Sequence, residues 1–574
     1  MRLKKTNSKN KSHYSIIEDI NKNGKRTTKV YENIGDEDAL ALRAGAEPVD
    51  VWVKKYLKEL NDKKREGNKP EIIKKSPNTL INKDKTCLFN VGHFFISSIY
   101  KKLQLDEICS KISSTTKIKF NMSDILQLII TARILNPSSK LGAFNSNKNY
   151  LFLPDVKLEN IYRSLKHFAN NKSKIIDQVY KNSKKHYTRN TRILYYDCTN
   201  YYFEIEESNG LKQYGKSKEN RPNPVVQMGM FLDSEGLPIT YSLTPGNTNE
   251  QTTLIPLEKT IENNIKDAEL VIVCTDAGLA SNANRKYNNT VNRSFVTTQS
   301  IKKLKTHLKK EALDLTNGWK IHGDPKKYDI SKLKTDENLR NQYRDTTFYK
   351  ERWINENGLE QRLIVTYSVK YQQYKSKIRE NQVERAKKIV EKNPSKLSKP
   401  KDNDPKRFIS TVNLTKSGEV AEEQIYSINK EIIDNEEMYD GLYAVCTNLK
   451  DDVSEIIRIN SNRWEIEESF RLLKTNFEAR PVYVSLDNHI EAHFLTCFLS
   501  LLIYRLIEVE LASEFSADQI INTIRSMKML EDNGVYLPAY TRTDITDLLH
   551  DKFKFRTDYE CTTYTKLNKI FKKL

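Results

Sequence analysis

The sequence predicts an α/β protein built on a mixed sheet, in which three antiparallel strands come before parallel ones and helices flank the sheet. Three observations support this fold class. Residues 191–245 carry strand-like apolar runs separated by turn residues. Helical patterns then alternate with buried strand-like runs up to residue 300. The chain has 574 residues, enough for a sizeable core and about two to four domains.

The first 190 residues are predicted to contain a small N-terminal region, a linker and a helical region. Residues 14–34 favour a β-hairpin with its turn at NKNG, and a helix follows, so we assign 1–62 to a hairpin and a helix. The polar segment 63–87 is the predicted linker. Residues 88–190 carry apolar side chains at helical spacing, with an N-cap signal at Ser123, which predicts a basic helical domain.

Residues 191–300 are predicted to form the first part of the sheet. TRILYYDCTNYYFEI, NPVVQMGMFLD and LPITYSLTP predict three antiparallel strands. QTTLIPLEKTIENNI predicts a crossover helix, and LVIVCTD predicts a buried strand that returns parallel to the first. A further helix and the strand SFVTTQS follow. This order is that of a ribonuclease H-like α/β core.

The rest of the chain is predicted to hold an insertion, the end of the core and a tail. Residues 301–439 mix Lys-rich helical segments with strand-like pieces, so we predict an inserted strand/helix domain. Residues 440–510 return to the core, with a strand at DGLYAVCTN and a helix from about 452 to 477. The most apolar run, Phe494–Ile503, is far shorter than the roughly 18 residues of a membrane span and predicts a buried core helix. Residues 511–574 are expected to be a helical C-terminal tail.

The charge of the chain favours a polyanionic partner. Lys and Arg number 95 against 75 Asp and Glu, a formal net charge of +20. Binding to phosphates releases counterions, so nucleic acid is favoured, although a basic soluble or ribosome-associated protein fits the charge equally well. The seven Cys are scattered without a CxxC spacing, which favours a reducing compartment over a disulfide framework or a zinc site. The basic N-terminus lacks the apolar core of a signal peptide, so we expect a cytoplasmic protein without a membrane partner.

Three carboxylates stand in settings that favour a common acidic cluster. Asp197 follows the apolar-aromatic run ILYY of the first strand, and Asp276 closes LVIVCTD. The predicted strand order places them side by side, at an edge where open α/β sheets bind ligands. With Glu467 from the long helix they are able to hold two divalent metals. Each also has a simpler interpretation: a turn cap for Asp197, a helix N-cap for Asp276, and a solvated ion pair for Glu467.

Glu467 shares one predicted helical face with four other polar residues, and a separate apolar stripe runs from Ile459 to Phe477. Steps of three or four residues connect the polar set, which is Asn460, Arg463, Glu467, Arg471 and Lys474. The pattern predicts an acidic residue on a basic ridge beside the core.

The segment NRWEIEESFRLLK matches the R-x3-E-x6-K part of the signature Y-x2-R-x3-E-x6-K, through Arg463, Glu467 and Lys474. The sequence therefore resembles a large group of bacterial insertion-sequence transposases of the DDE class, in a long, Lys-rich subgroup. Residues 214–254 and the motif VCTDAGL are similar to further regions of this family, and the resemblance extends over most of 10–510. One position departs: the signature Tyr is Asn460 here, which can hydrogen-bond a phosphate but cannot stack on a base.

The resemblance implies a transposase that cleaves DNA at the ends of its element and joins the 3′-OH to target DNA, in cut-and-paste transposition. It implies that Asp197, Asp276 and Glu467 are catalytic and hold two Mg²⁺ ions, for which Mn²⁺ substitutes. The implied partners are double-stranded DNA, both terminal inverted repeats and target, and a second copy of the chain in a synaptic complex. The implied location is the bacterial cytoplasm, at the nucleoid. A ribonuclease H-like nuclease without strand transfer and a non-catalytic sequence-specific DNA-binding descendant are the alternatives.

Further DNA contacts are expected around this centre. Residues 88–190 are expected to bind the DNA ends, with a packing role as the alternative. Trp319 and Trp353 are candidates to stack on an unpaired base, with core packing as the alternative. The candidates for contacts to the DNA are Asn460, Arg463, Arg471, Lys474, Lys216, Lys218 and Arg221. For the last three, which lie in the loop between the first two strands, an ordinary solvated basic turn is the alternative.

Overall fold

The computed structural model describes residues 1–7, 12–22, 25–67, 80, 83–262, 268–392, 404–414 and 423–574. The chain forms two compact units. The first comprises Met1–Lys85 with Asp532–Val535, and the second comprises Thr86–Glu531 with Tyr536–Leu574.

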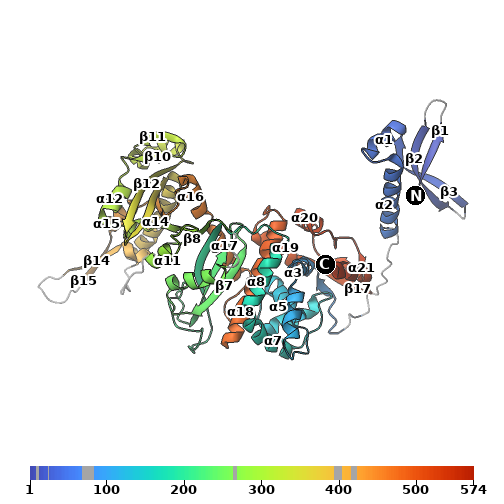
Figure 1. Ribbon diagram of the computed structural model, residues 1–574, viewed down its shortest axis with the longest axis horizontal. Helices are drawn as coiled ribbons and strands as arrows, with labels where there is room; N and C mark the ends of the chain where they lie inside the picture. Colours follow the sequence, from blue (N-terminus) through green and yellow to red (C-terminus); the bar gives the residue numbers. More distant parts are fainter. Residues whose placement is uncertain are drawn as a thin grey trace. The chain divides into compact units, whose positions relative to one another are not determined.

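The N-terminal part of the first unit is a three-stranded antiparallel sheet with two helices (Figure 1). Its elements are β1 (Arg2–Asn7), β2 (Ser12–Lys22), β3 (Lys25–Gly35), α1 (Glu37–Ala44) and α2 (Val49–Gly67). β2 and β3 pair as the predicted hairpin, and its turn at 23–24 falls outside the described residues. Sequence reasoning missed the edge strand β1. The two helices close a small core over the sheet, in which Ile16 and Leu40 are buried.

The second unit is built on a ten-stranded mixed sheet with the order β11-β10-β12-β13-β16-β9-β8-β5-β6-β7. Its strands are β5 (Ile193–Tyr202), β6 (Val225–Leu232), β7 (Pro238–Pro245), β8 (Val271–Thr275), β9 (Arg293–Thr298), β10 (Trp319–Ile321), β11 (Asp324–Tyr328), β12 (Thr347–Glu356), β13 (Leu359–Ser368) and β16 (Leu442–Thr447). β5, β6 and β7 form an antiparallel meander, β8 lies parallel to β5, and β9 lies parallel to β8. These directions confirm the predicted ribonuclease H-like core. Short helices α9 (Leu254–Thr260) and α11 (Asn282–Tyr287) connect its strands.

The strands of the inserted segment extend the core sheet. β13 pairs antiparallel with β16, and β16 pairs antiparallel with β9. The hairpin β12–β13 therefore continues the core sheet beyond β9, and a second hydrophobic cluster spans β9, β13 and β16. The other elements of this segment are α12 (Thr306–Leu313), α13 (Glu337–Gln342), α14 (Val369–Glu391), β14 (Ile409–Leu414), β15 (Glu423–Ile428) and α15 (Lys430–Glu437).

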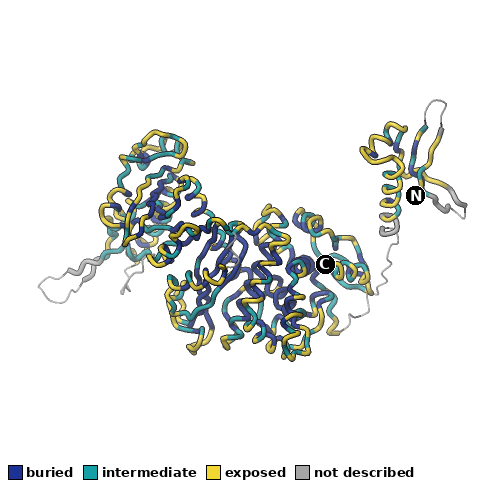
Figure 2. Tube along the Cα trace, viewed as in Figure 1, coloured by how far each residue is buried: buried dark blue, intermediate teal, exposed yellow. Residues whose placement is uncertain are grey.

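The helices of residues 88–190 share a core with the C-terminal half of the chain (Figure 2). They are α3 (His93–Lys102), α4 (Leu105–Ser114), α5 (Met122–Leu135), α6 (Lys140–Ser146), α7 (Leu158–Asn170) and α8 (Lys172–Ser183). α18 (Asp487–Glu510) packs against α3, α5 and α7. By length and composition α18 is able to cross a membrane, but 94% of its most apolar 18-residue stretch is buried inside the protein. It contains the predicted core helix.

The C-terminal residues include strands as well as helices. β17 (Lys528–Asp532) and β18 (Val535–Pro538) belong to a sheet with β4 (Leu88–Asn90) and β19 (Thr562–Thr563). The prediction of a purely helical tail over 511–574 is wrong for 528–538, because β17 pairs with β4 from the start of the unit. The helices here are α19 (Ala517–Ser526), α20 (Asp544–Phe553) and α21 (Tyr564–Lys573).

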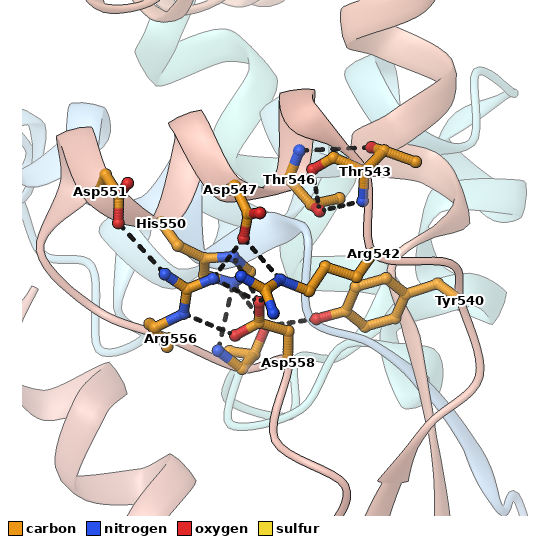
Figure 3. Close-up of polar contacts among 10 residues, drawn as sticks. Tyr540, Arg542, Thr543, Thr546, Asp547, His550, Asp551, Arg556 and Asp558 are labelled. Carbon is orange, nitrogen blue, oxygen red and sulfur yellow. Dashed lines mark hydrogen bonds and ion pairs between the residues drawn. The ribbon is translucent and has the colours of Figure 1, made fainter.

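A cluster of ion pairs fastens the segment after α20 to that helix (Figure 3). The Arg556 guanidinium reaches Asp547 and Asp551 on the helix and Asp558 beyond it. His550 and Thr557 are also hydrogen-bonded, with 3.0 Å between Nε2 and Oγ1. Both polar and apolar contacts therefore stabilise this end of the chain.

A buried ion pair holds the start of β5 against the β6–β7 turn. Neither Arg189 nor Asp233 has an exposed side chain, and Arg189 Nε lies 2.5 Å from Asp233 Oδ2. Arg189 also donates to Ser183 Oγ and to the Pro238 carbonyl, both at 2.8 Å. Asp233 Oδ1 accepts from the backbone N–H groups of the turn, at Glu235 and Leu237. The segment that leads into β5, the strand that carries Asp197, is thus anchored to the β6–β7 turn.

Candidate active site

The pairing of β5 with β8 brings Asp197 and Asp276 together. The two strands pair in parallel from Ile193 opposite Ile272 to Tyr196 opposite Thr275. The residue after Tyr196 is Asp197, and the residue after Thr275 is Asp276. Asp197 stays within β5, whereas Asp276 follows the end of β8. The strand order predicted this juxtaposition.

Arg463 connects Glu467 with Asp276, and its charge also acts on Asp197. The expected continuous helix from 452 to 477 is two helices, α16 (Val453–Ser461) and α17 (Trp464–Thr475), with Arg463 between them. Arg463 Nη2 lies 2.8 Å from Glu467 Oε1 and 3.9 Å from Asp276 Oδ1. The guanidinium is mostly covered by protein, so it connects the carboxylates from the inside of the site.

Asp197 is the least solvated of the three acids. Burial raises the pKa of its carboxyl to about 6, against the lowering effect of the Lys218 and Arg463 cations, and Asp276 adds a further rise. Lys218 also contacts the Cys198 carbonyl and lies 3.3 Å from Glu250. Three acids and two cations therefore share one small region at the end of β8.

The acids provide the donor chemistry that a divalent hard cation needs, since carboxylate oxygens are the ligands of Mg²⁺ and Mn²⁺. Asp276 and Glu467 have side chains that are 45% and 55% exposed, so both are accessible. Within the described ranges no three His, Cys, Asp or Glu side chains are close enough to hold a metal as they stand. Arg463 balances part of their charge instead. The raised pKa of Asp197 indicates a carboxylate that further positive charge would stabilise. The residues therefore fit a metal, provided that it takes over the contacts of Arg463.

Lys474 lies on the same face of β5 as Asp197. Alternate residues of a strand point to one side, so Asp197, Thr199 and Tyr201 share a face. Lys474 Nζ donates to Thr199 Oγ1 at 2.5 Å and lies 5.6 Å from the centre of the Tyr201 ring. Burial and the nearby Lys218 ammonium lower the pKa of Lys474 to about 8. A partly covered cation is therefore held two strand residues from Asp197.

The family model for the transposase DDE domain matches residues 202–503, which is more than half of the chain. The chain belongs to the DDE-domain transposase family. The match includes Asp276 and Glu467 and begins shortly after Asp197.

Solved transposase structures are similar to this DDE-family chain at low identity. The piggyBac transposase synaptic complex with hairpin DNA is 10% identical over 84% of this chain and 83% of that chain, with a TM-score of 0.35. The Mos1 mariner paired-end complex with Mn is 13% identical over 45% and 70%, with a TM-score of 0.14. No curated protein matches the sequence. The family assignment rests on the domain match.

Two residues of the predicted basic ridge lie away from this acidic centre. Asn460 is 8% exposed; its amide donates to Tyr443 Oη at 3.0 Å and accepts from Thr298 Oγ1 at 3.3 Å. The predicted phosphate contact of Asn460 is contradicted, because its amide is buried and already paired. Arg471 pairs with Glu468 at 2.6 Å and lines a different hollow, beside Asp518. The break between α16 and α17 removes the single ridge that unbroken helical spacing predicted.

The two tryptophans of the insertion differ in exposure. Trp319 is fully buried, and its Nε1 donates to the Asp314 carbonyl at 3.0 Å while Lys350 covers the ring at 4.8 Å. Base stacking by Trp319 is therefore wrong, and the packing alternative holds. Trp353 is 43% exposed on β12, so its stacking role stays a prediction.

The loop between β5 and β6 carries the other predicted cations. Lys216, Lys218 and Arg221 are all exposed, and their DNA contacts stay predictions. The Arg221 guanidinium lies 4.1 Å from the centre of the Tyr202 ring. Sequence reasoning missed Glu219 in this loop and Arg480 after α17, which form an ion pair beside Lys474. Glu219 lies within the family-like stretch 214–254, but no spacing or periodic pattern in the sequence connects it with Arg480.

Proposed function

We propose that this chain is a transposase that cleaves DNA at the ends of its own insertion sequence and joins the freed 3′-OH to target DNA, in cut-and-paste transposition. The observation that carries the proposal is that Asp276 and Glu467 lie 3.9 Å and 2.8 Å from the Arg463 guanidinium, whose charge also acts on Asp197. This acidic centre lies in a family member whose net charge is +20. Phosphoryl transfer requires charge of both signs around one phosphate, and the site provides it.

Asp197, Asp276 and Glu467 are the residues that would hold two Mg²⁺ ions, with Mn²⁺ as a substitute. Such ions, when bound, activate the attacking oxygen and stabilise the leaving one. The protein's own groups position the substrate. Arg463 provides a positive charge that binds the non-bridging oxygens of the DNA phosphate. Lys474, which is hydrogen-bonded to Thr199 on β5, binds the DNA backbone beside it.

The proposed partners are double-stranded DNA and a second copy of this chain. The DNA comprises the terminal inverted repeats of the element and the target. Because both ends of an element must be held while they are joined, a synaptic complex of two protomers follows from the proposed reaction. The proposed place of action is the nucleoid in the bacterial cytoplasm.

The test uses a labelled duplex that carries the inverted repeat flanking the reading frame, together with a plasmid target and Mg²⁺. A transposase produces a 3′-OH at the repeat and a covalently joined end–plasmid product. Cleavage without joining would instead support the nuclease alternative, and binding without cleavage would support the non-catalytic DNA-binding alternative. Inverted repeats bracketed by short target duplications would independently favour transposition.

Replacing Lys474 by Ala is expected to weaken DNA binding about tenfold, because one partly buried charged contact to a phosphate is lost. The slope of log affinity against log salt should become shallower by about 0.9. Fluorescence anisotropy over a series of salt concentrations measures both quantities. Lys387→Ala removes the same charge from an exposed position on α14 and serves as the control. An unchanged slope for Lys474→Ala would remove this residue from the interface.

DNA binding is expected to weaken as the pH rises through about 8. The lowered pKa of Lys474 means that its ammonium is charged below about 8 and loses its proton above it. Binding to a phosphate then has to restore the proton, so affinity falls by up to about tenfold for each further pH unit. Lys474→Arg keeps its charge over this range and should flatten the profile. Identical profiles for the two proteins would contradict the assignment.

A further inference from the structure

The tip of the loop between β5 and β6 is fastened to β5. Asn200, which is 6% exposed, donates from Nδ2 to the Lys216 carbonyl at 2.9 Å and accepts from the Lys218 backbone N–H at 3.2 Å. These two hydrogen bonds set the next residue, Glu219, at a defined place over the second half of the strand.

Glu219 lies between two cations that come from another part of the chain. Its Oε1 is 3.9 Å from Lys474 Nζ and forms an ion pair with Arg480. The side chains are only partly exposed, at 25% for Glu219, 16% for Lys474 and 25% for Arg480. Oε1 of this carboxylate therefore faces two mostly covered cations, while its Oε2 lies 4.0 Å from Arg221 Nε of its own loop.

The position of this cluster matters because it adjoins the acidic centre. Lys474 is bound to Thr199, two residues along β5 from Asp197, a distance of about 7 Å in a strand. Burial and the nearby Lys218 ammonium lower the pKa of Lys474 to about 8. Lys474 and Arg480 are both mostly covered by protein, and the carboxylate that balances their charge is Glu219.

We propose that Lys474 and Arg480 form a binding site for a substrate phosphodiester and that Glu219 occupies this site until DNA displaces it. The inference rests on the proposed function, since it takes DNA as the ligand, and deepens it by adding Arg480 as a phosphate contact and Glu219 as an internal competitor. A carboxylate and a phosphodiester each carry one negative charge and accept from forked donors. DNA displaces the Glu219 carboxylate because the protein binds other phosphates of the same DNA as well, and this binding releases counterions.

A purely structural role for Glu219 and a competing role predict opposite changes in DNA binding when its charge is removed. If Glu219 serves only to orient the loop, removing its charge loosens Lys218 and the loop cations, and DNA binding weakens. If Glu219 competes with phosphate, removing its charge frees Lys474 and Arg480, and binding tightens. The sign of the change separates the two roles.

The experiment measures the binding of a fluorescein-labelled duplex by anisotropy in EDTA, so that no cleavage takes place. Glu219→Gln should bind about fivefold more tightly than the wild type, the effect of losing one partly exposed ion pair. It should bring no gain in a Lys474→Ala/Arg480→Ala background. Glu204→Gln, an exposed acid of the same loop, removes the same charge as a matched control. Unchanged or weaker binding, or an equal gain in both backgrounds, overturns the proposal.

Arg480→Ala provides a second test that does not depend on the folding of the Glu219 variant. It should weaken binding of the same duplex about tenfold, and unchanged affinity would remove Arg480 from the site. Both measurements are independent of Mg²⁺-dependent cleavage. Failure of the inference therefore leaves DNA binding and end joining intact, whereas failure of the proposed function appears as missing cleavage in the wild type.

Discussion

Asp276→Asn is expected to reduce Mg²⁺-dependent end cleavage about a thousandfold while DNA binding stays within about twofold. Metal ligation in phosphoryl transfer supplies several kcal/mol of charge stabilisation, which corresponds to this loss in rate. Asp276 is suited to the test because its side chain is 45% exposed and follows the end of β8. Its replacement leaves the sheet and the core unchanged. Rates of cleavage on a labelled end, with binding measured in parallel, give the result.

The matched variants make the assignment specific. Glu467→Gln should behave like Asp276→Asn, since its carboxylate is joined to the same Arg463. Glu204→Gln should cleave like the wild type. Asp197→Asn is the less suitable variant, because it also removes the carboxylate that faces Lys218 and Arg463 inside the site. Wild-type cleavage by Asp276→Asn or Glu467→Gln would exclude these residues from catalysis.

Arg189→Met is expected to lower the free energy of unfolding by about 3–5 kcal/mol, because it leaves the fully buried Asp233 carboxylate without its partner. Arg189 additionally donates to Ser183 Oγ and the Pro238 carbonyl, and these acceptors lose their donor. Urea unfolding followed by tryptophan fluorescence measures the change.

A second substitution separates the buried charge from the lost packing. Asp233→Asn keeps an oxygen for the turn N–H groups of Glu235 and Leu237 and removes the charge. Arg189→Met/Asp233→Asn should therefore recover roughly half of the lost stability, since the uncompensated charge is the larger cost. A double variant as unstable as the single one would show that lost hydrogen bonds and packing, rather than charge, account for the effect.

The core of the fold could be predicted because its signals are local. Apolar runs, turn residues and one crossover determine the order of β5 to β9, and handedness then places β8 beside β5. The pairing of β13 with β16 and of β17 with β4 could not be predicted in the same way. Each joins segments that are far apart in the chain, and nothing in a strand's own pattern names its distant partner.

The candidate site divides in the same manner. Residue types, order and spacing pointed to Asp197, Asp276 and Glu467, and the structure brings these acids to one region. Helical spacing also pointed to Asn460, and aromatic chemistry pointed to Trp319. Both residues are buried in the structure. These two predictions failed because spacing shows which residues share a face but not which neighbours cover it.

The sequence by itself determined the class of fold, the three acids and the positive charge that favours DNA. Only the tertiary structure decided how that charge is arranged. It ended α16 before Arg463, so that the guanidinium joins Asp276 to Glu467. It also set Glu219 against Lys474 and Arg480. The physical reason is that ion pairs form between side chains that folding brings together, and their energies depend on burial and distance, which a linear pattern does not contain.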